Sequence, residues 1–381
     1  LVSDNALVAV RDAERDWELM SADQPIVIES TVVCGPEYRA EFAPSGNPET
    51  MLTLVGPSQV RWIPGQQVIN LEIGYGNGIV NLVDPGDGVR LLIGDIEIVA
   101  KTESSGAVLA YAVTHYREMG ADPMVPENHG LRIELSSVMG DFSISGFKDP
   151  VELGSGSLFT YDSARSDSDQ GEVTRPTRLA PWIDPEIDTG TLESEAASDL
   201  LELVRSDQAD SLLLSLRVAL GFRRDEVVAL AGKTMLALGD ASAYFGIDGL
   251  FSKPKQRLYW SAHLDAVRAM MDRSVQDAAA VRTAISGQDA VMDDADGDTL
   301  FRLLRGYSQD QLETGGDAEL VADLESGSVS VRVLAIEHLR DISGTTLFFK
   351  PEEEVVSSRE KVIDRWKVRL RKESIRYAKV E

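Results

Sequence analysis

A glycine-rich run is the first stretch of this sequence whose residue types could do chemistry. "GYGNG", from Gly74 to Gly78, would let backbone amides approach a phosphate closely. A dinucleotide-binding loop also needs a helix that opens directly after the glycines. The residues that follow here, "IVNLVD", alternate as those of a strand do. The run therefore predicts a hairpin turn between two strands.

A cluster of aspartates, "DDADGDTL", is the second such stretch. Asp294, Asp296 and Asp298 are spaced as calcium ligands can be. An EF-hand loop also needs Gly at its sixth position and Glu at its twelfth, and counting from Asp294 these positions hold Thr299 and Arg305. The pattern favours an acidic turn between helices in which Asp298 caps the next helix. Incidental calcium binding is the alternative.

The histidines and the single cysteine do not form a recognisable reactive set. His115, His129, His263 and His338 are far apart in the sequence, and no two stand at a spacing such as HExxH. We expect each to be an ordinary surface or partly buried histidine. Cys34 lies in a strand-like stretch without a neighbouring histidine, which predicts a buried structural thiol rather than a nucleophile.

Motifs of common enzyme classes are also missing from the sequence. There is no G-x-S-x-G elbow and no Walker loop. A pair of carboxylates suited to glycoside hydrolysis stays open, because 63 acidic residues always permit some pair. We therefore predict a protein that is not an enzyme, with no catalytic residue, no cofactor and no bound metal.

The charge of the chain limits its partners. A net charge of -26 repels phosphate backbones, so we expect no nucleic-acid partner. Basic residues nevertheless crowd the last part of the chain. They are Arg359, Lys361, Arg365, Lys367, Arg369, Arg371, Lys372, Arg376 and Lys379. This run is typical of a solvated helix face, and a docking surface for an acidic partner is the sharper alternative.

The periodicity of the sequence divides it into two halves. A length of 381 residues exceeds the usual size of one core, so two domains are expected. Residues 1–162 read as short alternating strands separated by turn residues, which predicts an all-β domain, a sandwich, barrel or β-solenoid. Residues 163–190 are rich in Ser, Asp and Pro and read as a linker, in which Trp182 would pack on the following domain. Residues 191–381 carry helical periodicity in runs joined by short turns, which predicts an α-solenoid of degenerate helix pairs.

The β half resembles a FecR-type domain of bacterial envelope proteins, over about residues 5–162. Residues 71–80 resemble one of its strands and residues 138–153 its closing strands. The other matching positions are Gly56, Pro57, Ser58, Val60, Gly140 and Gly154. The sequence departs from the family at Asp23 and Gln24, where a glycine is usual. The resemblance implies a regulatory or surface protein of the cell envelope.

The helical half, from about residue 191 to 381, resembles HEAT-like repeat proteins of bacterial envelopes, most clearly in its terminal unit. The residues that fit the pattern are Ala335, Leu339, Ile342, Gly344, Pro351, Arg359 and Trp366. Ser343 and Gly344 would end one helix, "TTLFF" would run extended, and Trp366 would pack the final helix. Proteins of this family bind other macromolecules, so the resemblance implies a binding surface without an active site.

Together these features predict a non-enzymatic periplasmic or cell-envelope protein that binds or scaffolds another macromolecule in envelope signalling. Its partner would be a protein or an envelope polymer. No window approaches the ~20 apolar residues of a membrane helix. Because the chain begins at Leu1 rather than Met, we expect an upstream segment, either a signal peptide or a membrane anchor.

The alternative is a carbohydrate-binding or carbohydrate-active envelope protein that uses the β-domain. Sugar rings stack on exposed, roughly coplanar aromatic side chains. The β half offers Trp62, Tyr75, Tyr111, Tyr116 and Tyr161 for such a platform.

Overall fold

The chain folds into two compact units, each built from two separate stretches of sequence. The structure is a computed structural model that describes residues 3–12, 15–44, 49–165, 171–184, 191–207, 211–287 and 294–378. The first unit comprises residues 1–116 and 130–238, and the second comprises residues 117–129 and 239–381. This division differs from one at residues 163–190, because the first helices group with the sheet and residues 117–129 group with the later helices.

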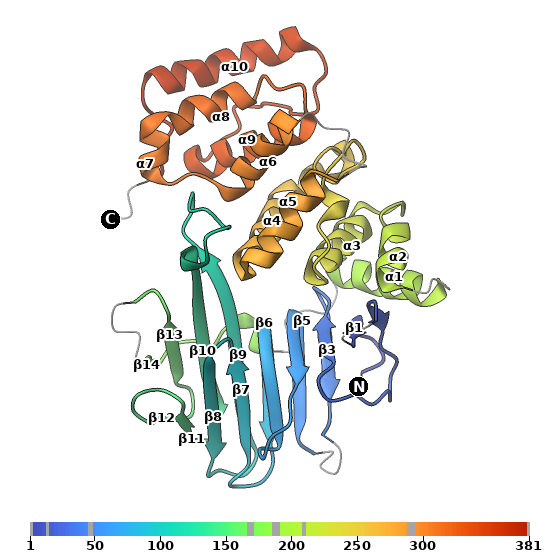
Figure 1. Cartoon of the computed structure of the whole chain (residues 1–381), viewed down its shortest axis with the longest axis vertical. Coiled ribbons are helices and arrows are strands. Elements are labelled where there is room, and N and C mark those ends of the chain that lie inside the picture. The colour runs from blue at the N-terminus through green and yellow to red at the C-terminus, as the bar shows by residue number, and fades with distance from the viewer. Residues whose placement is uncertain are drawn as a thin grey trace. The chain divides into compact units, whose positions relative to one another are not determined.

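A single branched sheet forms the body of the first unit (Figure 1). Its strands are β1 (Val8–Arg11), β2 (Glu18–Leu19), β3 (Thr31–Cys34), β4 (Arg39–Phe42), β5 (Met51–Trp62), β6 (Ile69–Leu82), β7 (Gly88–Ile93), β8 (Ile96–Thr102), β9 (Ala107–Arg117), β10 (His129–Met139), β11 (Phe142–Ser145), β12 (Val151–Leu153), β13 (Leu158–Asp162) and β14 (Glu172–Thr174). The main path runs β12-β11-β8-β7-β6-β5-β3-β1-β2, and a second arm of β9, β10, β13 and β14 leaves it at β6. The order of a β-rich part followed by helices is confirmed.

The branch arises because β6 is 14 residues long and changes partner along one edge. Its first part, from Ile69 to Glu72, pairs in parallel with β7. Its second part, from Gly76 to Leu82, pairs antiparallel with β9, while β5 follows it along the other edge. The expectation of a β-solenoid or sandwich is therefore wrong: the described strands join one largely antiparallel sheet. Alternation predicts which residues face a core, but not which strands pair.

The glycine run lies inside β6, so the predicted hairpin turn at Gly74–Gly78 is also wrong. Opposite it, β5 carries a register shift between Val55 and Gln59. A Cβ at Gly78 would lie 2.4 Å from the Tyr111 ring, and Gly76 has a φ of +99°. Glycine is needed here because a bulge and a tightly packed aromatic ring occupy the space that a side chain would need.

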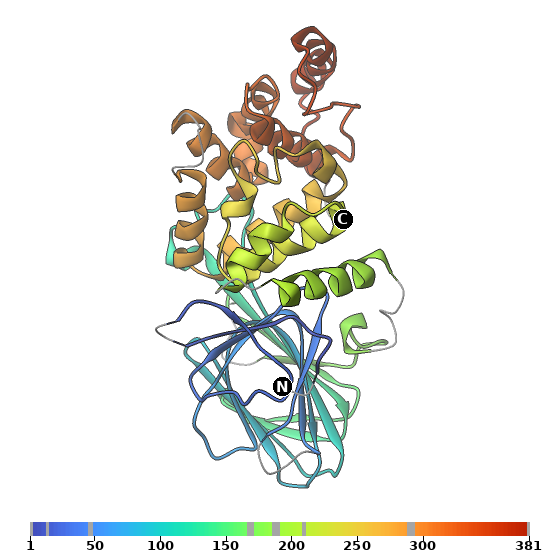
Figure 2. The same cartoon turned by 90° about the vertical axis from the view of Figure 1, so that its right-hand side faces the viewer.

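Three helices complete the first unit: α1 (Leu192–Ser206), α2 (Leu212–Ala219) and α3 (Asp225–Ala237). Thr191 caps α1 by accepting a hydrogen bond from the Ser194 amide. Figures 1 and 2 show these yellow-green helices beside the blue strands, and α3 packs on β5. Trp182, expected to pack on the following domain, instead packs on a sheet cluster that includes Val55 and Ile79.

Aromatic side chains of the sheet hydrogen-bond to the helices of the first unit. The Tyr38 hydroxyl donates to the Ala197 carbonyl at 2.6 Å, and the Tyr75 hydroxyl donates to the Ala237 carbonyl at 2.6 Å. Trp17, which is fully buried, donates from Nε1 to the Leu238 carbonyl at 3.0 Å. Two of the three acceptors lie at the end of α3, where carbonyls lack intrahelical partners.

The second unit contains α4 (Trp260–Arg273), α5 (Val275–Ile285), α6 (Asp294–Arg305), α7 (Gln309–Gln311), α8 (Asp317–Asp323), α9 (Val329–Ser343) and α10 (Val356–Arg371). Helix α9 is buried along almost its whole length and packs against α4, α6 and α8. A central helix surrounded by others differs from a row of pairs that contact only their neighbours. The predicted HEAT-like solenoid is therefore corrected to a cluster around α9.

The terminal features of α9 and α10 follow the sequence reasoning more closely. Gly344 ends α9 in a left-handed conformation, with a φ of +72°, as expected. Trp366 is completely buried. The "TTLFF" stretch, however, forms a turn instead of an extended crossing. Of the helices that the structure describes, none is both long and apolar enough to cross a membrane.

We expect Tyr75→Phe to lower the free energy of unfolding more than Tyr38→Phe. The Ala237 carbonyl is in the last turn of α3 and loses its partner, at a cost of about 1–3 kcal/mol. The Ala197 carbonyl lies inside α1 and keeps its helical hydrogen bond. Tyr38→Phe should therefore lower the free energy of unfolding by less than about 1 kcal/mol. Urea unfolding measures the free energy of unfolding of each variant, and equal decreases would contradict this account.

Candidate binding pocket

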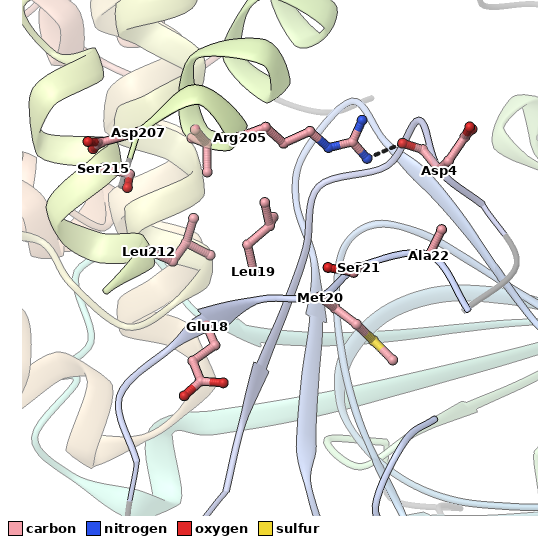
Figure 3. A pocket seen from close by; sticks show the side chains of 11 residues that line it. Asp4, Glu18, Leu19, Met20, Ser21, Ala22, Arg205, Asp207, Leu212 and Ser215 are labelled. Carbon is pink, nitrogen blue, oxygen red and sulfur yellow. Dashed lines mark hydrogen bonds between the residues drawn. The ribbon is translucent and has the colours of Figure 1, made fainter. Parts of the chain in front are cut away.

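A pocket of about 560 Å³ in the first unit is the candidate functional site. It lies between the N-terminal strands and the first two helices (Figure 3). Its lining residues are Asp4, Glu18, Leu19, Met20, Ser21, Ala22, Val204, Arg205, Asp207, Leu212 and Ser215. The volume is in the range of small-ligand sites.

Backbone pairing fixes the two walls of the pocket. On the strand side, β1 pairs with β2, and the Met20 amide donates to the Val8 carbonyl at 2.8 Å. On the helix side, the Leu212 amide at the start of α2 donates to the Trp17 carbonyl at 2.9 Å. The pocket thus forms where a short hairpin meets the junction of α1 and α2.

The bottom of the pocket is apolar and its rim is acidic. Met20, Val204 and Leu212 are buried side chains. Around them, Asp4, Glu18 and Asp207 contribute carboxylates, while Arg205 is the one cation among the lining residues. The lining therefore has a net negative charge.

The Arg205 side chain is directed away from Asp207. Its guanidinium donates to the backbone carbonyl of Asp4, and Figure 3 shows the side chain extended toward Asp4 and away from Asp207. Asp207 follows directly after α1, where the carbonyl ends of the helix already create a negative potential. Its buried Oδ2 has no hydrogen-bond partner within the described part of the chain. A carboxylate in this position favours a cation beside it.

None of these pocket residues was singled out from the sequence. Glu18 and Asp207 are distant in the sequence and approach only through the packing of β2 and α1. The available signal was local: acids surround the break between two amphipathic runs in "VRSDQADSLLL".

Cys34 is a fully buried free thiol, as expected. Burial raises the pKa of its thiol to about 12. The thiolate, which is the reactive form, is therefore strongly disfavoured.

The aspartate cluster lies largely within α6, which begins at Asp294. Asp298 is inside this helix and lies 3.6 Å from Arg282 in an exposed ion pair, so the prediction that it caps the helix is wrong. Asp293 lies outside the described residues. Among the described residues, no three acidic, His or Cys side chains are grouped to hold a metal ion.

The four histidines are held in separate places. His115 Nε2 lies 2.8 Å from the Gly74 carbonyl oxygen in the first unit. In the second unit His129 contacts the Asp272 carbonyl, whereas His263 and His338 are fully buried. The last two are thus more deeply buried than predicted.

The aromatic residues considered for sugar binding do not form an exposed platform. Tyr75 and Tyr111 are buried. Trp62 packs on Phe42 with ring centroids 5.2 Å apart, and Tyr161 packs on Phe147 at 5.5 Å. The remaining member, Tyr116, donates its hydroxyl to Asp162. These side chains serve packing and hydrogen bonding within the sheet.

Buried ionisable groups in the second unit form a network around α4 and α9. Arg117 pairs with Asp272 at 3.1 Å, and burial raises the pKa of that carboxyl. Arg268 Nη2 lies 2.7 Å from Nε2 of His338. Burial and the neighbouring Arg268 lower the pKa of His338 to about 3. Each of these groups bonds to another helix or loop of the same unit, which indicates a structural role.

We expect His338 to lower the free energy of unfolding as the pH falls from about 6.5 to about 3. In this window the unfolded chain binds a proton at His338 and the folded chain does not, so stability declines by up to about 1.4 kcal/mol per pH unit. His338→Gln keeps hydrogen-bonding capacity but cannot titrate, so its stability should decline less.

The measurement is the free energy of unfolding by urea at several pH values. Buried acids with raised pKa values, such as Asp272 and Glu337, act in the opposite direction. They are present in both proteins and cancel in the comparison. Parallel pH curves for the two proteins would contradict the assignment.

Comparisons with known proteins add little to this geometry. No family model matches the chain, and no curated protein matches it. Among solved structures, two crystal structures described as a "putative anti-sigma factor" from Parabacteroides distasonis ATCC 8503 show TM-scores of 0.26. They are 12% and 11% identical over 38% of this chain, which spans 57% of theirs. At this TM-score the likeness assigns neither fold nor function.

Proposed function

We propose that this protein is a non-enzymatic binding protein whose pocket holds a basic side chain of another macromolecule. The observation that carries the proposal is the combination of an apolar bottom with an acidic rim in a pocket of about 560 Å³. Lys and Arg have this same division, because an apolar stem carries a charged head. The stem would lie against Leu19 and Leu212, and the head would reach Asp207.

Asp207 is the acceptor we assign to the cationic head. Asp207 lines the pocket, and the nearby carbonyl ends of α1 add to the negative potential. Glu18 on β2 lines the same pocket from the strand side. An arginine head, with its fork of donors, matches the geometry of a carboxylate.

The cellular setting that we propose is the cell envelope, in a binding or scaffolding role in signalling. Its support is the sequence resemblance of residues 5–162 to FecR-type domains. The carbohydrate alternative is weakened because Tyr75 and Tyr111, two members of its aromatic set, are buried in the sheet.

We expect the pocket to distinguish a charged from a neutral side chain of the same shape. The probe is a short peptide with one arginine between apolar residues, compared with the same peptide carrying citrulline. Binding can be followed by the methyl resonance of Met20, which lines the pocket. The arginine peptide should bind about 5- to 10-fold more tightly, as one charged contact of about 1–1.4 kcal/mol gives.

Asp207→Asn should remove most of this preference while leaving the fold intact, because the amide has nearly the same shape and Oδ2 of Asp207 makes no hydrogen bond within the described residues. Glu103→Gln is the matched control, since Glu103 is an exposed acid outside the pocket. Equal binding of both peptides by the unaltered protein would overturn the proposed binding mode. So would an Asp207→Asn variant that keeps the full preference.

The proposed location has its own test. We expect the full-length natural gene product, detected with an antibody to this chain, to fractionate with the membrane or periplasm of its cell. Recovery in the cytosol would contradict the envelope assignment without affecting the peptide result.

A further inference from the structure

The C-terminal helix α10 is rich in cations. The helix has six basic and two acidic side chains, in a chain whose net charge is -26. Its Ile363 and Trp366 are buried against the second unit, where α10 packs on α8. Figures 1 and 2 show α10 at one end of the helical unit.

Of the six cations of α10, three contact other groups of the unit and three, Lys361, Arg365 and Arg371, are exposed. Three are used within the unit: Lys367 pairs with Glu325 at 2.7 Å, Arg359 donates to the Ser326 carbonyl at 3.2 Å, and Arg369 lies over the Trp366 ring at 5.6 Å. The pKa of Lys367 is raised mainly by Glu325 and to a smaller extent by the helix acids Asp364 and Glu360.

Lys361 and Arg365, together with Lys372 just after the helix, lie along one straight stripe. Lys361, Arg365, Val368 and Lys372 follow the i, i+4, i+7, i+11 spacing that places residues on one helix face. All four are exposed, Val368 by 40%. Within the described part of the chain, none of the three cations makes an ion pair. The stripe spans about 16 Å along the helix.

This stripe is unfavourable for the helix itself. Lys372, just past the last turn, does compensate the negative end of the helix dipole. Lys361 and Arg365 lie further toward the N-terminal end, where no acid occupies the first turn. As like charges at i and i+4 they destabilise a helix by a few tenths of a kcal/mol. Their placement therefore needs an explanation outside the helix.

We propose that the stripe formed by Lys361, Arg365, Val368 and Lys372 docks an acidic helical segment of a partner protein. A helix that presents acids at the same spacing would meet all three cations and place an apolar residue against Val368. A membrane surface is a poorer fit, because peripheral helices insert an apolar face, and the apolar face of α10 is already buried. The surface lies in the other unit from the pocket and has the opposite charge, so it is independent of the proposed function.

The test uses a helical peptide of about 20 residues with Glu, Glu, Leu and Glu at matching positions. A scrambled peptide of the same composition and vesicles containing phosphatidylserine serve for comparison. By fluorescence anisotropy, the patterned peptide should bind the full chain about 10-fold more tightly than the scrambled one, and salt should weaken it.

The triple variant Lys361→Glu, Arg365→Glu and Lys372→Glu should lose the preference for the patterned peptide. The matched control, Lys101→Glu, Lys148→Glu and Lys255→Glu, changes the net charge equally at exposed positions elsewhere and should keep it. Because all six side chains are exposed, both variants should fold, which circular dichroism checks. Equal binding of the two peptides would overturn the proposal. Binding to vesicles but not to the patterned peptide would also overturn it.

Discussion

The fold of the first unit depends on β6 having two different partners along one edge. A strand has two edges, and β5 occupies one of them for most of its length. The other edge is shared between β7 and β9, so the sheet must divide at that point. Gly76 and Gly78 lie in the second segment, where the space for side chains is filled by β5 and by Tyr111. The two arms of the sheet follow from this division.

Because acidic side chains outnumber basic ones, a cation without an acidic partner is unusual in this protein. With 63 acidic and 37 basic side chains, an ordinary cation readily finds an anion nearby. Arg224 contacts Asp199, and Arg302 contacts both Glu319 and Asp323. A surface that keeps cations apart from acids, as one face of α10 does, has to be maintained against that background. The acidic pocket is the reverse case, because its one arginine is bound to a carbonyl.

Local periodicity predicted the types of element but not their long-range partners. Most strands and helices were expected near where they occur, since alternation and helical spacing depend only on neighbouring residues, although β6 runs through the predicted turn and β14 lies in the predicted linker. The glycines of β6 were misread because their reason is a bulge in β5 and the ring of Tyr111, neither of which is local. Trp182 was assigned to the following domain for the same reason. The pocket could not be predicted, because Glu18 and Asp207 come to line one cavity only after the first unit has folded.

The exchange of segments between the two units has a consequence for how the chain is made. Residues 117–129 belong to the helical unit, although they leave the ribosome in the middle of the sheet. His129 must wait for a partner 143 residues further along, the carbonyl of Asp272. The residue that its ring contacts is therefore made long after the connection between β9 and β10. The two units are therefore not successive products of translation, and no single cut in the chain separates one complete unit from the other.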